Sequence, residues 1–136
     1  HDALPILEQS GMPKEIYNNP KTSFVARFIG NYNVLSKDVF QKYFKKNIDT
    51  KEVAIRPEVI QITKEEIRNE VEYNLKDCEI TDVSITGNVI RYETRKDNLT
   101  MNIDVINNDI YDACDIKLGD KVNIFVPKKQ CIFLTA

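Results

Sequence analysis

The side chains that most often carry out chemistry are few in this chain and do not form a group. Its only histidine is His1, and no Gly-x-Ser-x-Gly element is present, so the sequence offers no Ser–His–Asp arrangement. Cys78, Cys114 and Cys131 lie far apart, without the Cys-x-x-Cys spacing typical of zinc sites. We expect three reduced thiols, no catalytic residues and no metal ligands.

Acidic residues and glycines also lack the spacing that binds cations or phosphates. Asp109, Asp112 and Asp115 recur every three positions, but the central glycine and the final glutamate of a calcium loop are missing. The four glycines are isolated from one another, so no glycine-rich phosphate loop is present. The acidic stretch is therefore interpreted as a solvated loop.

Length and charge restrict the class of protein. The chain has 136 residues, of which 42% are hydrophobic and 29% charged, as in a globular domain with its own core. Its net charge of -2 gives no electrostatic reason to expect a nucleic-acid partner. The first residues lack the basic start and apolar core of a secretory signal, and we expect a cytoplasmic protein.

The first third of the sequence predicts short helices. Pro13 suits the first turn of a helix, and Gly30 suits the left-handed cap that ends one. Ser36 is a good N-cap for a further helix with an apolar face. Residues 31–35 are interpreted as a linker. The predicted helices span residues 13–19, 21–29 and 37–45.

The stretch at residues 53–62 predicts two short strands with a break between them. Apolar residues alternate on both sides of Arg56, Pro57 and Glu58. Proline cannot donate to a sheet, so Pro57 marks the break. Arg56 and Glu58 are candidate interface or ligand residues, and the structural alternative is an ion pair that brackets the break.

From residue 78 onward the sequence predicts one strand after another. The alternation slips once within residues 78–86, which indicates a β-bulge. Tight turns separate the strands, and residues 127–129 are expected to close a final hairpin. The predicted fold is mainly β with N-terminal helices (α+β): a small antiparallel OB-like barrel preceded by two or three short helices. The predicted domains are a helical connector at 1–49 and the barrel at 50–136.

Three segments resemble a known family. The sequence G-M-P-K-E-I-Y-N-N-P at 11–20, continued by F-V-A-R-F-I-G at 24–30, is similar to the junction that follows the ATPase domain in ATP-binding subunits of ABC importers. The A-I-R-P-E run at 54–58 resembles the opening of their transport-associated OB (TOBE) domain. Residues 119–122 and 126–133 resemble its closing strands. The Walker motifs and the signature loop of that family are absent from this sequence.

The resemblance implies a regulatory and dimerisation domain of a solute importer that is not itself an enzyme. It implies no cofactor in this chain, with ATP and Mg²⁺ bound by the full-length subunit. The implied partners are a second copy of the chain, as a homodimer, and the membrane subunits of the transporter, reached through the ATPase domain. The implied location is the cytoplasmic side of the cell membrane.

Two alternatives remain. Related barrels in molybdate and sulfate importers bind small oxyanions, and here Ser84, Thr86 and Lys128 are the candidate ligand residues, with a small anion as the partner. The other alternative is a nucleic-acid-binding OB protein, which would stack bases on Tyr92 and Phe125. Acidic residues are as frequent as basic ones on the predicted strands, so we expect no nucleic acid to bind.

Overall fold

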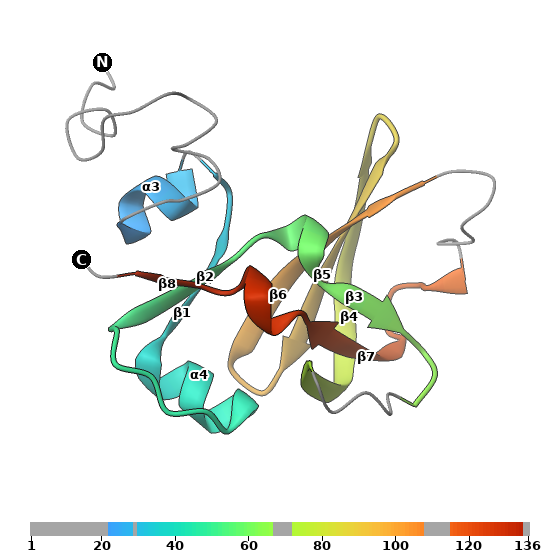
Figure 1. Cartoon of the computed structure of the whole chain (residues 1–136). Coiled ribbons are helices and arrows are strands. Elements are labelled where there is room, and N and C mark those ends of the chain that lie inside the picture. Colours follow the sequence, from blue (N-terminus) through green and yellow to red (C-terminus); the bar gives the residue numbers. More distant parts are fainter. Residues whose placement is uncertain (1–21, 29, 67–71, 108–114, 135–136) are drawn as a thin grey trace, which may run out of the picture. The chain divides into compact units, whose positions relative to one another are not determined.

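A computed structural model of the chain describes residues 22–28, 30–66, 72–107 and 115–134 (Figure 1). It divides into two compact units, each with its own antiparallel sheet: His1–Arg56 with Gln130–Ala136, and Pro57–Lys129. No helix within the described ranges has the length and apolar character needed to cross a membrane. The predicted helix at 13–19 lies outside the described residues.

The first unit is a three-stranded sheet with two short helices. Strand β2 lies in the middle and pairs with both β1 and β8. Its elements are α3 (Ser23–Phe28), β1 (Asn33–Ser36), α4 (Lys37–Phe44), β2 (Glu52–Ile55) and β8 (Ile132–Leu134).

Helix α4 confirms the prediction for residues 37–45. The Oγ of Ser36 accepts a hydrogen bond from the backbone N–H of Val39 at 3.3 Å, as an N-cap does. Phe40 and Phe44 form its buried face, one turn apart. The helix ends where Lys45 turns left-handed, with φ 57°.

The end of α3 differs in detail from the prediction for Gly30. Asn31, not Gly30, takes the left-handed conformation, with φ 54°. A Cβ at position 30 would overlap the ring of Tyr32, at 2.5 Å from its Cδ1 atom. Tyr32 in turn packs with Ala26, Ala54 and Leu134 in the core of this unit. Glycine is therefore needed at position 30 to make room for a neighbouring side chain.

The prediction of a linker at 31–35 is wrong, because residues 33–36 form strand β1. Leu35 is buried and lies opposite Val53 of β2. Asn33 is buried as well, and its Nδ2 donates to the backbone oxygen of Ile55 at 3.2 Å. A polar residue at an inward position hides the alternation by which a strand is recognised.

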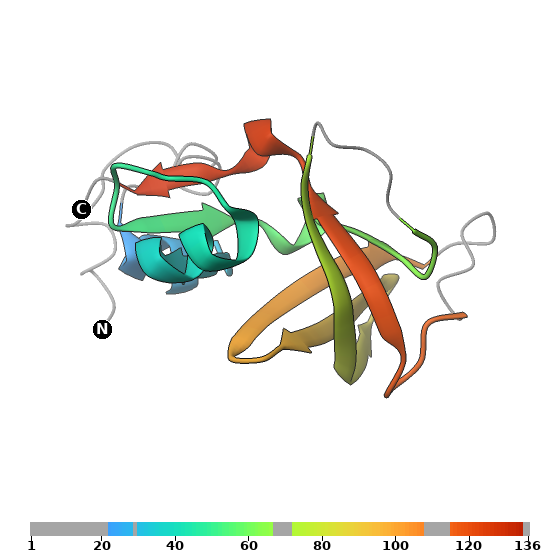
Figure 2. The same ribbon diagram turned by 90° about the horizontal axis from the view of Figure 1, so that it is seen from below.

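The second unit is a five-stranded curled sheet in the order β3-β7-β4-β5-β6 (Figure 2). Its core includes Ile80, Tyr92, Met101, Ile103 and Ile124, each at most 1% exposed. Its elements are η1 (Pro57–Val59), β3 (Gln61–Thr63), β4 (Tyr73–Thr86), β5 (Val89–Lys96), β6 (Leu99–Ile106) and β7 (Lys121–Val126). The 3-10 turn η3 (Lys128–Gln130) contains residues of both units.

Three further predictions are confirmed. The stretch at 53–62 is broken at Pro57: β2 belongs to the first sheet and β3 to the second. The register between β4 and β5 shifts between Ile80 and Asp82, as the slipped alternation indicated. The mainly β fold with short helices and an OB-like curled sheet is confirmed.

The predicted final hairpin is wrong. Strand β7 pairs with β3 and β4, whereas β8 pairs with β2 in the other sheet. Two short apolar runs around Pro127 favour a hairpin in the sequence, but pairing partners are set by tertiary packing. The predicted boundary between a connector at 1–49 and a barrel at 50–136 stays a prediction.

Candidate functional site

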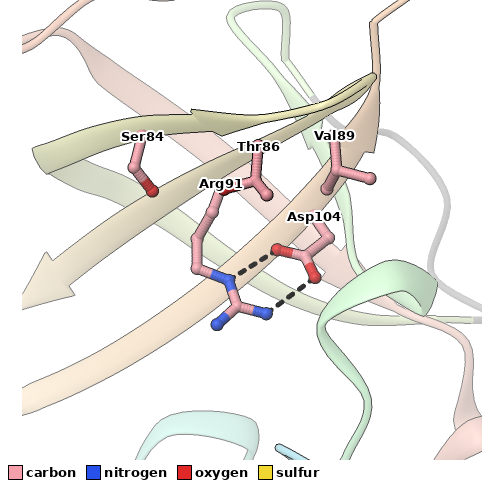
Figure 3. A pocket seen from close by; sticks show the side chains of 5 residues that line it. All are labelled: Ser84, Thr86, Val89, Arg91 and Asp104. Atoms are coloured by element: carbon pink, nitrogen blue, oxygen red, sulfur yellow. Dashed lines mark hydrogen bonds and ion pairs between the residues drawn. The ribbon is translucent and has the colours of Figure 1, made fainter.

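A hollow of about 280 Å³ lies on one face of the sheet formed by β4, β5 and β6. Its lining residues are Ser84, Thr86, Val89, Arg91 and Asp104 (Figure 3). Strand register explains why they meet, since Ser84 lies opposite Arg91 and Arg91 opposite Asp104, in one row across three strands. Thr86 and Val89 form the next row on the same face.

An ion pair between Arg91 and Asp104 forms one wall of the hollow. The Nε and Nη2 atoms of Arg91 donate to the two carboxylate oxygens of Asp104 at 2.7 and 2.8 Å. The side chains are 34% and 18% exposed, so water screens the pair only in part. The arrangement offers two exposed hydroxyls beside a neutralised pair, which suits hydrogen bonding to a small polar group.

The structure brings Ser84 and Thr86 together but places Lys128 elsewhere. Lys128 is exposed in η3, and its Nζ lies 5.2 Å from the ring centroid of Tyr73. Tyr73 begins β4, whereas Ser84 and Thr86 lie near the other end of this strand of 14 residues. The three candidate anion ligands therefore do not form one site in this chain.

Arg56 and Glu58 belong to different units. The Nη2 of Arg56 donates to the Oε1 of Gln130 at 2.7 Å, which links the end of β2 to the residues before β8. Glu58 lies exposed in η1 of the second unit. The ion pair between Arg56 and Glu58 stays a prediction.

The described cysteines are buried, and metal-binding groups are scattered. Burial raises the pKa of the Cys78 thiol to about 11, and Cys131 is buried as well. Cys114 lies outside the described residues. Within the described ranges no three His, Cys, Asp or Glu side chains come together as a metal site would need.

Comparison with known proteins shows which family the chain resembles. The profile of the TOBE domain family matches residues 53–134. The spermidine/putrescine import ATP-binding protein PotA of Bacillus thuringiensis subsp. konkukian (strain 97-27) is 36% identical over 118 residues, which cover 87% of this chain and 32% of that protein. PotA of Clostridioides difficile (strain 630) is 39% identical over 75 residues, covering 44% of this chain and 21% of that protein.

A solved structure has a similar fold. The cytoplasmic molybdate-binding protein ModG, in a crystal form with molybdate bound, superposes with a TM-score of 0.52 at 5% sequence identity. The superposition covers 71% of this chain and 70% of that chain.

The curled sheet and its likeness to ModG place the protein in the class of small OB-like barrels. The chain belongs to the TOBE domain family, which matches well over half of it. It is similar to the C-terminal region of importer ATP-binding subunits, and it spans about a third of the length of the first of these relatives.

Proposed function

We propose that this chain is a regulatory and dimerisation domain of the ATP-binding subunit of an ABC solute importer. The family match over residues 53–134, together with relatives that are import ATP-binding proteins, carries the proposal. The names of those relatives favour spermidine and putrescine, or similar polyamines, as the transported solutes. The membrane subunits of the transporter and a second copy of the chain are the proposed partners.

Catalysis belongs, in this proposal, to the part of the longer relatives that this chain does not match. The described glycines are isolated, and the described acidic residues form no cluster that would hold Mg²⁺. We assign ATP and Mg²⁺ to the ATPase domain of a full-length subunit. Such a subunit would lie on the inner face of the cell membrane.

Dimerisation is tested by sedimentation equilibrium of the chain over a wide concentration range. A dimerisation domain is expected to show twice the mass of one chain at high concentration and to dissociate on dilution. A single-chain mass at every concentration would count against this role.

A second candidate function is binding of a small oxyanion. Ser84 and Thr86 line the same hollow, and their exposed hydroxyl groups are suitable donors to an oxyanion. Molybdate and sulfate are expected to raise the melting temperature of the chain if they bind there, and Ser84→Ala should remove the increase. Spermidine serves as the comparison ligand, and equal melting curves with and without each anion would exclude this candidate.

A further inference from the structure

Strand β6 is the one long sheet edge among the described strands. Of the four edge strands, β1, β3 and β8 have three or four residues, whereas β6 has eight. Edge strands expose unpaired backbone groups, and proteins usually shorten them or place Lys or Pro on them. β6 contains neither lysine nor proline.

Hairpin register shows which backbone groups of β6 face this edge. Lys96 and Leu99 flank a two-residue turn and so form a hydrogen-bonded pair with each other. Every second residue from Leu99 onward then bonds to β5, a pattern continued by the N–H of Asn107, which donates to the oxygen of Asn88 at 2.7 Å. The N–H and C=O groups of Asp104 and Ile106 therefore point away from β5.

The end of β6 extends beyond the segment that lies against this strand. η1 packs against β6, and Figure 1 shows the strand continuing past η1 to its arrowhead. The single charge of the strand, Asp104, is neutralised by Arg91 of its own chain. Ile106 is 51% exposed, beside the half-buried Val89. This end therefore combines open backbone groups, exposed apolar surface and no net charge.

We propose that residues 103–107 of β6 pair antiparallel with the same residues of a second copy of the chain. A two-fold axis through Val105 places Asp104 of each copy opposite Ile106 of the other. These outward-facing residues then form the hydrogen-bonded pairs, and the two Val105 side chains meet directly. This inference rests on the proposed dimerisation function and names its surface.

Repulsion between like charges favours this register over the one whose two-fold axis passes through the preceding residue. An axis through Asp104 would place two carboxylates directly opposite each other, which destabilises a strand pair. The axis through Val105 avoids this and brings Ile106 of each copy into diagonal contact. The same strand on both copies makes an isologous, closed interface, as expected of a two-fold dimer.

A disulfide across the axis tests the register. The two Val105 residues form a non-hydrogen-bonded pair with a Cα separation of about 4.5 Å, within the roughly 4.4–6.8 Å of disulfides. In a Cys114→Ser background, Val105→Cys is expected to give a covalent dimer under mild oxidation. Leu118→Cys, on a turn and 68% exposed, is the control that should cross-link only slowly. Equal cross-linking of both variants would overturn the register.

A charge on the edge tests the surface itself. Ile106→Lys is expected to weaken the dimer about tenfold or more, because a lysine at an open edge opposes strand pairing. Leu118→Lys, the matched change outside the edge, should leave dimerisation unchanged, and circular dichroism melting checks that both variants fold. A dimer that both variants retain would overturn this inference while the proposed function stands. A wild-type chain that is monomeric at all concentrations would overturn both.

Discussion

Substitution of Gly30 tests how the first unit is packed. In Gly30→Ala the new Cβ would lie 2.5 Å from Cδ1 of Tyr32, well inside the roughly 3.5–4.0 Å that suits two carbon atoms. The ring is 6% exposed and packs with Ala26, Ala54 and Leu134, so it cannot move without disturbing that cluster. The change is therefore an overpacking of the core.

The expected loss follows from two opposing effects. Overpacking costs about 1–3 kcal/mol, whereas replacing glycine by alanine restricts the unfolded chain and returns about 0.4–1 kcal/mol. With the middle of each range, Gly30→Ala should therefore lower the free energy of unfolding by about 1.3 kcal/mol. Tyr32→Leu removes the ring, and in that background the same Gly30→Ala change should be neutral or slightly stabilising.

Urea unfolding followed by circular dichroism measures all four members of this cycle. Gly119→Ala is the control, because Gly119 has φ 88° with open space around it, so its substitution causes backbone strain that Tyr32→Leu should not relieve. A Gly30→Ala chain as stable as wild type, or an equal loss in the Tyr32→Leu background, would refute the packing argument.

Three further predictions follow from local contacts. Ser36→Ala should lower the free energy of unfolding by about 0.5–2 kcal/mol through loss of the α4 cap, and Ser36→Asp should keep most of it, as measured by urea unfolding. Burial raises the pKa of Cys78 to about 11, so its thiol should resist a thiol reagent at pH 8 until urea unfolds the chain. Because the folded state favours the protonated thiol, the free energy of unfolding should fall as the pH rises from about 9 to about 11. Cys78→Ala should lack that fall. The backbone N–H of Lys117 and the ammonium of Lys64 lower the pKa of Asp120, so its NMR titration should lie below that of an ordinary aspartate, and Lys64→Ala should move it up. Stability from Asp120 is present above the ordinary pKa of aspartate and is lost as the pH falls through the lowered value, so Asp120→Ala should weaken acid unfolding in that range.

Local patterns predicted the regular elements well. Ser36 before an apolar helical face predicted α4, and the slipped alternation within residues 78–86 predicted the bulge in β4. These signals depend on neighbours in the sequence, so they survive in the fold. The same reasoning failed at Asn33, because its buried amide donates a hydrogen bond to the backbone of Ile55, which lies 22 positions away in the sequence.

Long-range pairing limited the prediction of the candidate site. Ser84 and Thr86 were predicted and do line one hollow, but Arg91 and Asp104 were missed as its charged wall. The turn at residues 97–98 could have predicted this pair, because a hairpin centred on that turn pairs Arg91 with Asp104. The separation of Lys128 from Ser84 could not be counted in this way, because it depends on where β7 joins the sheet.

Uptake of radiolabelled spermidine tests the importer assignment most directly. The segment encoding residues 53–134 is deleted from the gene in the cells that carry it, and uptake is compared with that of cells complemented by the intact gene. We expect spermidine uptake to fall sharply while uptake of an unrelated solute is unchanged, and complementation to restore it. Normal spermidine and putrescine uptake in the deletion cells would contradict the proposed role in a polyamine importer.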